Sequence, residues 1–256
     1  MDIFQALILG VVQGITEWLP VSSSGHLVLL QQLFSLGSSV AFDVLLHVAT
    51  LIVIFIVFWK DIIAIFKSLI NVKWDENTKL FFFIVLASIP TAIIGLAFND
   101  FLKGLFTNML LLGVFFIING IILFLTKFAK EKQGKKLNWW QSILIGIAQG
   151  ISIIPSISRS GATVSTGLFL GIKKEKLIKF SFLMAIPAII GAFVMESGDL
   201  SFENPLAMII GSLAALIVGY FSLKFIIQLI EKGKWHYFAY YCVLLGIIIL
   251  ILRLYS

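Results

Sequence analysis

Charged residues are scarce in this sequence: only 12% of the 256 residues are Asp, Glu, Lys or Arg, whereas 60% are hydrophobic. A soluble domain needs more polar residues than this to cover its surface, so the composition excludes a soluble globular protein. It favours a polytopic membrane protein, in agreement with a mean hydropathy of +1.07. Because no Pro/Gly/Ser-rich linker interrupts the hydrophobic runs, we expect one membrane domain over residues 1–256.

Other absences exclude further classes of protein. Cys242 is the single cysteine, so no intrachain disulfide can form. The phosphate-binding pattern GxxxxGKS/T does not occur, which argues against ATP hydrolysis, and no Cys/His spacing typical of a metal site is present. Met1-Asp2 opens the chain without a basic segment, and Gln13 and Glu17 interrupt the first apolar run, so we expect no cleaved signal peptide.

The net charge of +6 does not indicate a nucleic-acid partner, because the lysines lie in short loops between apolar runs. That distribution is the orientation signal of membrane proteins, whose basic loops face the cytoplasm. We therefore expect no nucleic-acid partner and a multi-pass membrane protein. The loops expected on the cytoplasmic side are 60–79, 127–139, 173–179 and 230–236.

Hydrophobic runs near the ~20 residues that a spanning helix needs occur six times. Pro90 predicts a kink in the second of them. Residues 61–74 have apolar side chains at helical spacing together with lysines, so we expect them to lie in the membrane interface. The predicted spans are 40–59, 80–98, 105–126, 180–195, 206–229 and 237–252.

Two polar stretches, 13–26 and 149–163, interrupt shorter apolar pieces. Pieces such as 3–12 and 27–34 are too short to span, so each stretch predicts two short helices joined at a Pro/Ser/Gly break. Such a pair reads as a re-entrant hairpin that enters and leaves by one face. Irregular backbone at membrane depth is tolerated only where protein or a wet cavity satisfies it, so a cavity is implied.

The two polar stretches also resemble each other. Threading the spans puts the first hairpin on the outer face and the second, within 140–172, on the cytoplasmic face, which predicts an inverted-topology repeat. Its halves are 1–126 and 140–254, joined by the basic loop 127–139, and its site lies at the midplane where the breaks meet. Chance similarity between Gly/Ser-rich breaks is the alternative. The matching residues are Gly10, Gln13, Gly14, Ser22, Ser24 and Gly25 with Gly146, Gln149, Gly150, Ser158, Ser160 and Gly161.

The predicted fold is therefore an all-α polytopic membrane protein with six transmembrane helices and two re-entrant helical hairpins. Within it, Gln13 and Glu17 share one helix face because they are four residues apart. A buried carboxylate without a partner would protonate, so Glu17 indicates a nearby cation, either Arg159 or a divalent metal. One carboxylate and one amide suit Mg²⁺ or Ca²⁺ only with a substrate phosphate added. A polar pair that satisfies backbone groups is the alternative.

The run Ser22-Ser23-Ser24-Gly25-His26 follows Pro20 and opens the second short helix. A helix N-terminus binds phosphate readily, so Ser22, Ser24 and Gly25 are candidate substrate-binding residues. His26 can reach a serine hydroxyl one turn away, which makes Ser23 a candidate nucleophile with His26 as its base. Ordinary N-capping explains the serine run equally well. Attack by a water that Glu17 or His26 activates also remains open.

The run Ser158-Arg159-Ser160-Gly161-Ala162-Thr163 follows Pro155 in the same way. A guanidinium can hold two phosphate oxygens at once, so Arg159 is the sharpest single signal for phosphate chemistry. Ser158, Ser160, Gly161 and Thr163 are expected to bind substrate beside it. Asp43 and His47, four residues apart in the first predicted span, are interpreted as supporting or structural residues.

Together these segments resemble the signatures of bacterial undecaprenyl-diphosphate phosphatases, the bacitracin-resistance family, over the whole length of the chain. The resemblance rests on Gln13-x-x-x-Glu17, on Pro20-Val21-Ser22-Ser23-Ser24-Gly25-His26 and on Pro155-Ser156-Ile157-Ser158-Arg159-Ser160. The first segment is similar to the family's (Glu/Gln)-x-x-x-Glu motif, with glutamine at the first position, which bears on metal affinity. The sequence departs from the family pattern at Ser156, where the family usually has glycine, and this bears on the geometry of the loop.

The resemblance implies hydrolysis of undecaprenyl diphosphate to undecaprenyl phosphate, which recycles the lipid carrier of peptidoglycan synthesis and confers bacitracin resistance. It implies a divalent cation and a multi-pass protein of the bacterial inner or plasma membrane, with a site open to the outer face. From the residues themselves, the expected cation is Mg²⁺ or Ca²⁺, held by Gln13 and Glu17 with substrate phosphate. Gln13 and Glu17 belong to the family's acidic motif, Ser23 and His26 to its Ser/His motif, and Arg159 to its arginine motif.

The alternative function is transport, as a lipid-phosphate flippase or anion carrier, because inverted repeats with broken helices are also a transporter architecture. The expected partners are a polyprenyl diphosphate substrate, membrane lipids and, as one option, a second copy of the chain in a homodimer.

Overall fold

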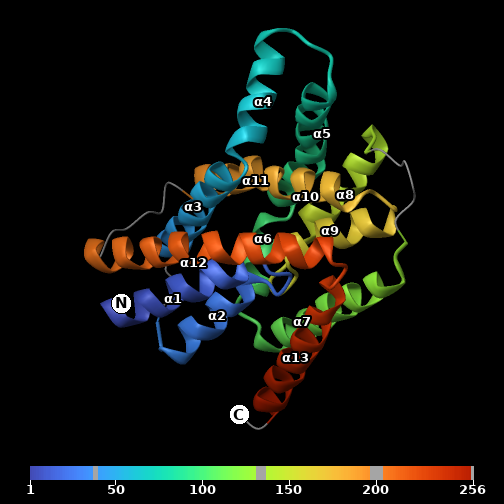
Figure 1. The fold of residues 1–256 in the computed structure, drawn as a ribbon. Coiled ribbons are helices and arrows are strands. Elements are labelled where there is room, and N and C mark those ends of the chain that lie inside the picture. Colours follow the sequence, from blue (N-terminus) through green and yellow to red (C-terminus); the bar gives the residue numbers. More distant parts are fainter. Residues whose placement is uncertain (37–39, 131–136, 197–203, 255–256) are drawn as a thin grey trace.

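The computed structural model describes residues 1–36, 40–130, 137–196 and 204–254, and these residues form helices and no strands (Figure 1). This confirms the predicted all-α membrane fold. Five helical segments are long and apolar enough to cross a membrane, which matches five of the six predicted spans. They are Glu76–Ala97, Met109–Phe128, Lys174–Glu196, Pro205–Glu231 and Trp235–Leu254.

Pro90 lies inside the helix of the first segment, Glu76–Ala97. The third segment, Lys174–Glu196, consists of two helices. The short helix α6, between the first and second segments, was not predicted. The elements are α5 (Glu76–Ala97), α6 (Asn99–Leu105), α7 (Met109–Leu125) with η1 (Thr126–Phe128), α10 (Lys174–Leu183), α11 (Ala185–Glu196), α12 (Pro205–Glu231), and η3 (Trp235–Tyr237) with α13 (Phe238–Leu254).

The sixth predicted span, 40–59, is shorter than expected. It corresponds to α3 (Val40–Val57), after which the chain turns by 74° into α4 (Trp59–Ile70). The pair counts as a span only if both helices are taken together. In Figure 1, α4 and the start of α5 extend beyond the other helices. An interfacial position of residues 61–74 stays a prediction.

Each polar stretch lies between two short helices, as predicted. The first hairpin is α1 (Ile3–Thr16) and α2 (Ser23–Leu33), and the second is α8 (Trp139–Ile151) and α9 (Arg159–Phe169). At 1.5 Å per residue, the 14 residues of α1 extend only about 21 Å, less than a hydrocarbon core of about 30 Å. Entry from one face is compatible with these lengths and stays a prediction.

The two hairpins are built alike. Asp2 and Gln5 form a capping box at the start of α1, and Asn138 and Gln141 form one at the start of α8. In a capping box, two side chains satisfy backbone N–H groups that the helix leaves free. The resemblance that the sequence shows at the breaks therefore extends to the beginnings of both hairpins.

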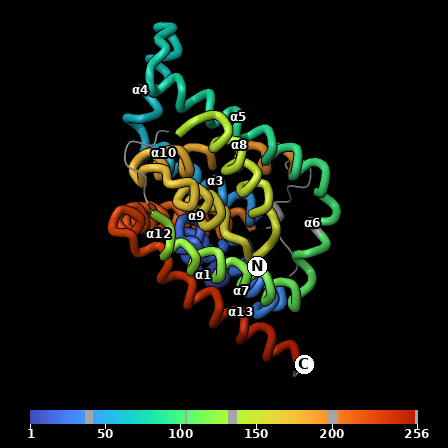
Figure 2. The backbone as a smooth tube through the Cα atoms, turned by 90° about the vertical axis from the view of Figure 1, so that its right-hand side faces the viewer, coloured from blue at the N-terminus to red at the C-terminus, as the bar shows by residue number. Residues whose placement is uncertain are grey.

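Glycines let each hairpin pack against a long helix of the other half. A Cβ atom added to Gly10 of α1 would lie 2.1 Å from the carbonyl oxygen of Gly211 in α12. One added to Gly146 of α8 would lie 2.2 Å from the carbonyl oxygen of Ala87 in α5. Figures 1 and 2 show α1 beside α12 and α7 beside α13. Exchanged packing of this kind is what an inverted repeat predicts, and the opposite orientations of the halves remain a prediction.

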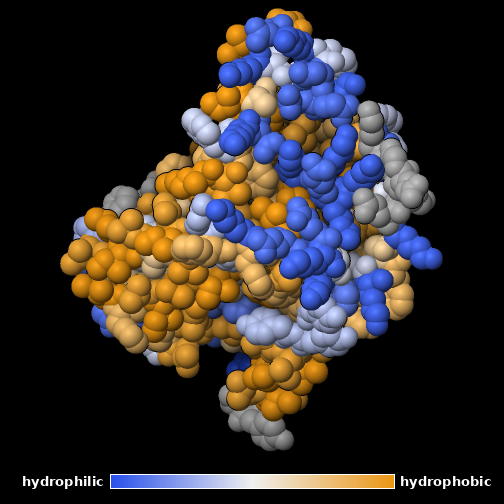
Figure 3. Space-filling view, viewed as in Figure 1, coloured by the Kyte–Doolittle hydropathy of each residue, from blue (hydrophilic) through white to orange (hydrophobic). Residues whose placement is uncertain are grey.

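Hydrophilic residues gather on one side of the molecule. Figure 3 shows them in a band that runs from the outer ends of α4 and α5 toward the C-terminal end of α12, whereas apolar residues cover the side near α1. Residues 131–136 of the predicted basic loop lie outside the described residues. The exposed lysines described at helix ends and in loops are Lys60, Lys67, Lys73, Lys127, Lys130, Lys173, Lys232 and Lys234.

Candidate active site

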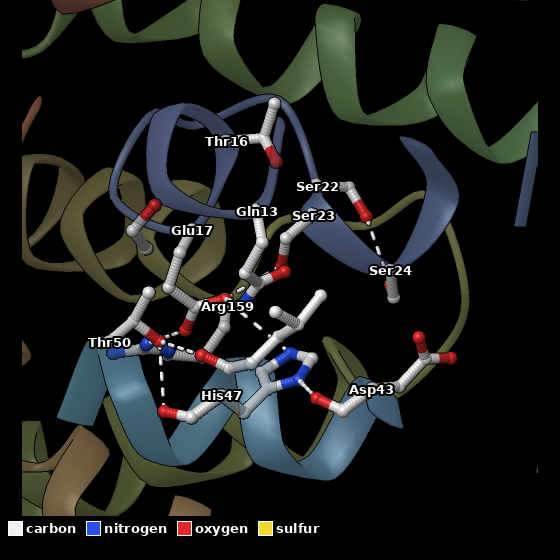
Figure 4. A network of polar contacts seen from close by, with 12 residues as sticks. Gln13, Thr16, Glu17, Ser22, Ser23, Ser24, Asp43, His47, Thr50 and Arg159 are labelled. Carbon is white, nitrogen blue, oxygen red and sulfur yellow. Dashed lines mark hydrogen bonds and ion pairs between the residues drawn. The ribbon is translucent and has the colours of Figure 1, made fainter. Parts of the chain in front are cut away.

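The carboxylate of Glu17 is the centre of a buried polar cluster at the end of α1 (Figure 4). Its Oε1 accepts a hydrogen bond from Nη2 of Arg159 at 2.6 Å. Its Oε2 accepts from Oγ of Ser23 at 2.7 Å and from Nε2 of Gln13 at 3.1 Å. Glu17 is only 7% exposed, so the expectation that this buried carboxylate has a cation beside it is met by Arg159.

The two helices that follow the breaks each contribute their first residue to this carboxylate. Ser23 is the first residue of α2, and Arg159 is the first residue of α9. The residues before them are N-caps: Ser22 Oγ accepts from the N–H of Gly25 at 3.3 Å, and Ser158 Oγ accepts from that of Gly161 at 3.1 Å. Ser23 and Arg159 occupy equivalent positions of the two hairpins and both contact the Glu17 carboxylate, although about 140 residues separate them in the chain.

Two polar atoms of the cluster are buried and have no partner within the described residues. These are Nη1 of Arg159 and Oε1 of Gln13. The guanidinium also lies over the indole of Trp18, with Cζ 5.6 Å from the ring centroid. A buried donor left unpaired costs free energy, so Nη1 has the chemistry to hold an oxygen of an anionic ligand.

His47 of α3 joins the cluster, as a supporting residue would, although the sequence did not identify Glu17 as its partner. Its Nε2 lies 3.5 Å from Oε2 of Glu17, and its Nδ1 lies 2.7 Å from the main-chain oxygen of Asp43. A carbonyl oxygen can only accept, so Nδ1 carries a proton and Nε2 faces the carboxylate. The available signal was an imidazole four residues after a carboxylate in a largely apolar span. The Asp43 side chain bonds elsewhere, accepting from Nε2 of Gln31 at 2.7 Å.

His26 does not contact a serine hydroxyl, so its predicted pairing with Ser23 needs correction. Its Nδ1 lies 2.7 Å from the main-chain oxygen of Ser22, and its Nε2 lies 2.6 Å from the hydroxyl of Tyr241 in α13. The His26 and Tyr241 rings are stacked with centroids 5.7 Å apart. The helix turn directs the imidazole toward α13, and the group that Ser23 contacts is Glu17.

The other predicted serines differ in how accessible they are. Ser22, Ser158 and Ser160 are buried, and the last two lie 3.4 and 3.3 Å from the main-chain oxygen of Leu19 in the opposite break. These contacts fit the capping explanation and also join the two breaks. Ser23 and Ser24 are only half-buried, so a ligand can reach them.

Three further predicted substrate-binding residues are buried: Thr163, Gly25 and Gly161. Thr163 is fully buried, with its hydroxyl 2.5 Å from that of Ser181 in α10. Added Cβ atoms at Gly25 and Gly161 would lie 2.6 Å from the Phe116 ring and 2.9 Å from the Ser158 side chain. Small residues at these positions therefore allow close packing, and direct substrate binding by Thr163 stays a prediction.

The cluster offers a divalent cation few ligands. Within the described residues, no group of three or more His, Cys, Asp or Glu side chains could hold a metal ion. Glu17 is the one carboxylate of the cluster, and Arg159 lies against it. The free Oε1 of Gln13 is a suitable hard oxygen ligand. A cation would therefore need oxygens of a bound phosphate to complete its coordination.

Comparisons with known proteins find a matching family and relatives that cover nearly the whole chain. The family model described as "Bacitracin resistance protein BacA" matches residues 6–248. A protein of Carboxydothermus hydrogenoformans named undecaprenyl-diphosphatase is 45% identical, covering 99% of this chain and 98% of that protein. Relatives with the same name from Treponema denticola and Korarchaeum cryptofilum are 43% and 40% identical. The first of these two covers 96% of both chains, and the second covers 98% of this chain and 99% of the relative.

Proposed function

Because the chain belongs to the bacitracin resistance protein BacA family, we infer that it is a membrane phosphatase that acts on undecaprenyl diphosphate. It hydrolyses the phosphoanhydride bond and yields undecaprenyl phosphate and inorganic phosphate. The observation that carries this inference is the buried Glu17 carboxylate, which Ser23 and Arg159 contact from two separate hairpins. Recycling of the lipid carrier for peptidoglycan synthesis, with bacitracin resistance, is the cellular role we propose.

Arg159 is proposed to bind the diphosphate. Its Nη2 is occupied by Glu17, and its Nη1 is the donor that can hold a phosphate oxygen. The N-termini of α2 and α9 both lie at the cluster and add the positive ends of two helix dipoles. Fixed positive groups of this kind stabilise the negative charge that spreads over a phosphoryl group during its transfer.

Ser23 is proposed as the nucleophile and Glu17 as its base. The Ser23 hydroxyl donates to Glu17 at 2.7 Å, so the carboxylate can take the proton while Oγ attacks the terminal phosphorus. The bond from phosphorus to the bridging oxygen breaks, undecaprenyl phosphate leaves, and water then hydrolyses the phosphoserine. Direct attack by a water that Glu17 activates is the alternative. A trapped phosphoserine would support the first route, and substantial turnover by Ser23→Ala would support the second.

We further propose that Mg²⁺ or Ca²⁺ binds together with the substrate. Gln13 Oε1 and Glu17 would hold the ion with phosphate oxygens, and the ion would supply charge neutralisation for the diphosphate. Chelation with EDTA should abolish phosphate release, and Gln13→Glu should lower the cation concentration needed for half-maximal rate. Full activity in EDTA would contradict this.

The site is proposed to open toward the outer face of the plasma membrane. The support is the distribution of exposed lysines at the ends of α4, α7 and α12, which indicates the cytoplasmic side. The apolar surfaces beside the hairpins would leave the isoprenoid tail in lipid while the diphosphate enters the cluster.

Phosphate release by the purified protein in detergent tests the function, because detergent solution has no compartments between which a carrier could transport. Glu17→Gln and Arg159→Ala should each lower kcat/KM at least 100-fold, roughly the value of one well-placed charged group. Matched controls are Asp100→Asn and Lys60→Ala, which change exposed charges outside the cluster. Binding of the lipid diphosphate without phosphate release would instead support the carrier function.

A further inference from the structure

Asn119 lies in the middle of α7, and its side chain is the one polar side chain in a helix otherwise made of apolar residues and glycine. The residue is only 1% exposed. A buried amide among apolar groups is unfavourable unless its donors and acceptor are paired. The hydrogen-bond partners of the Asn119 side chain therefore indicate why an asparagine stands in this helix.

Both ends of the Asn119 amide form hydrogen bonds with main-chain groups. Its Nδ2 donates to the carbonyl oxygen of Pro20 at 2.8 Å, and its Oδ1 accepts from the N–H of Ser158 at 3.1 Å. A carbonyl can only accept and an N–H can only donate, so these partners fix the orientation of the amide. The Nδ2 atom also lies 3.3 Å from Sγ of Cys242.

The two partners belong to the two different breaks. Pro20 lies three residues after Glu17, and Ser158 directly precedes Arg159. Backbone in a break lacks the regular hydrogen bonds of a helix, so contacts from outside the break decide its position. Beside the 2.6 Å pair of Arg159 and Glu17, direct contacts run from Ser158 and Ser160 to Leu19, and these are longer at 3.4 and 3.3 Å. Asn119 thus connects one break to the other through a single side chain, by hydrogen bonds shorter than the contacts to Leu19.

We propose that Asn119 is a positioning residue of the active site. By holding the two breaks at a fixed separation, its amide keeps the Arg159 guanidinium and the Glu17 carboxylate in the geometry that binds and attacks a diphosphate. This role rests on the proposed function. A displacement of about 1 Å in such a site can lower the rate roughly 100-fold, so a side chain that touches no substrate can still control turnover.

Asn119→Leu is the main test, because leucine has a similar volume and forms neither hydrogen bond. Thr91→Val is the matched control: Thr91 is also buried, and its hydroxyl joins α5 to α8 by a 2.9 Å hydrogen bond to the main-chain oxygen of Gly146. Each variant is compared with the wild type for its Tm in detergent, for kcat and KM, and for the Kd of inorganic pyrophosphate.

The variant Asn119→Leu should raise KM and the Kd of pyrophosphate about tenfold and lower kcat about 10- to 100-fold. Thr91→Val should leave KM and Kd unchanged even where its Tm falls equally. A loss of folded protein lowers only the apparent kcat, so the change in Kd separates a displaced site from a destabilised fold. In an Arg159→Ala background, Asn119→Leu should weaken pyrophosphate binding no further.

Wild-type KM, kcat and Kd values in a folded Asn119→Leu variant would overturn the proposal. If this variant does not fold, Asn119→Ser, which keeps one hydrogen-bonding group, decides in its place: an intermediate rise in Kd supports the role, and an unchanged Kd overturns it. Failure of the proposed function has a different result. Wild-type protein would then bind pyrophosphate without releasing phosphate from the lipid diphosphate, and absence of pyrophosphate binding would overturn both.

Discussion

Glu17 shows how much one buried carboxylate can organise. Arg159, Ser23 and Gln13 donate to its two oxygens, and His47 lies beside them. Burying an ionised carboxylate costs free energy unless the group is paired and hydrogen-bonded. Removing one partner of Glu17 therefore destabilises the folded protein as well as changing the site. At the residue scale, therefore, the chemistry and the stability of the site depend on the same side chains.

Arg159→Lys tests whether the shape of the guanidinium is needed as well as its charge. Lysine can still pair with Glu17, but its three N–H donors share one nitrogen, so it cannot also place a donor at the position of Nη1. We expect kcat/KM for undecaprenyl diphosphate to fall about 10- to 100-fold, less than for Arg159→Ala, with KM carrying most of the change. The kinetic measurement uses protein of equal Tm. Equal kcat/KM for Arg159→Lys and the wild type would mean that a point charge suffices.

Ser156 is expected to be a strained position. Its φ is +67°, a backbone conformation that favours glycine, and its fully buried hydroxyl has no partner within the described residues. Ser156→Gly removes a strain of about 1–2 kcal/mol and the unpaired hydroxyl, and the greater freedom of glycine in the unfolded chain offsets part of this gain. The free energy of unfolding in detergent should rise by about 1 kcal/mol.

The control for that change is Ser88→Gly, within helix α5, where glycine has no conformational advantage. It should lower the free energy of unfolding by about 0.5–1 kcal/mol. Both values come from the same equilibrium unfolding measurement. A loss of stability in Ser156→Gly as large as that in Ser88→Gly would show that the backbone of the break adapts to serine.

At the scale of elements, the hairpins depend on close packing against α12 and α5. Gly10→Ala and Gly146→Ala would put a Cβ atom 2.1 and 2.2 Å from backbone oxygens, so the helices must separate. Without a hydrophobic driving force between helices in lipid, close backbone contact is a main source of association. Each substitution should destabilise the protein by about 1–3 kcal/mol, measured by unfolding in detergent.

Two other helical glycines provide the comparison. Added Cβ atoms at Gly104 and Gly191 meet nothing within 4 Å. Alanine at either position should leave stability unchanged or raise it slightly, since alanine favours helix more than glycine does. If Gly10→Ala and Gly191→Ala shifted the Tm equally, close packing of α1 on α12 would not be a source of stability.

The turn between α4 and α5 should depend on pH through Asp75. This residue is the N-cap of α5, and hydrogen bonds from the backbone N–H of Thr78 and the hydroxyl of Ser68 lower the pKa of its carboxyl. A lowered pKa means that the ionised form is favoured by folding. Its contribution is therefore complete above the unfolded pKa of about 3.9 and is lost as the pH falls through the lower, folded value.

Hydrogen exchange, corrected for the intrinsic effect of pH, measures this contribution at the first amides of α5. Protection should be constant from pH 7 to about pH 5 and fall below about pH 4. Asp75→Asn should lower protection at pH 7 and remove the decrease at low pH, because an amide does not titrate. The same acid-dependent decrease in Asp75→Asn would assign it to another group.

For the whole molecule, composition and local pattern were enough to predict the membrane fold and the centre of the site. Apolar runs predicted five spans correctly, and the scarcity of charge at depth correctly suggested Arg159 as a cation beside Glu17. Contacts that distant packing decides could not be predicted in this way. The ring of His26 is oriented by Tyr241, 215 residues away, and the imidazole of His47 meets Glu17 only because α3 packs on α1.

The short helix α6 was missed for a related reason, whereas the bend after α3 lies where the predicted span 40–59 meets the stretch 61–74 that was expected in the interface. With only seven residues, which begin at the polar pair Asn99-Asp100, α6 is too short for a hydrophobic period to indicate it. Local pattern fixes which residues prefer lipid or a buried position, but helix ends inside an apolar run depend on neighbouring helices.

Orientation in the membrane gives the prediction with the widest consequence. If the basic loops are cytoplasmic, a cysteine at Thr107, between α6 and α7, should react with a membrane-impermeant maleimide in intact cells. One at Lys173 should react only after permeabilisation. Thr107 and Lys173 are both exposed in the structure, and Cys242 is fully buried, so the wild type should stay unlabelled.

The same labelling decides whether the first hairpin is re-entrant. A hairpin that enters and leaves by one face puts Asp2, just before α1, on the same side as Ser35, just after α2, and both residues are exposed in the structure. Asp2→Cys and Ser35→Cys should then both be labelled in intact cells. Labelling of Asp2→Cys only after permeabilisation, with Ser35→Cys labelled in intact cells, would mean that α1 and α2 together cross the membrane. The halves would then no longer form an inverted repeat, and the meeting of Ser23 and Arg159 at Glu17 would need an origin other than internal symmetry.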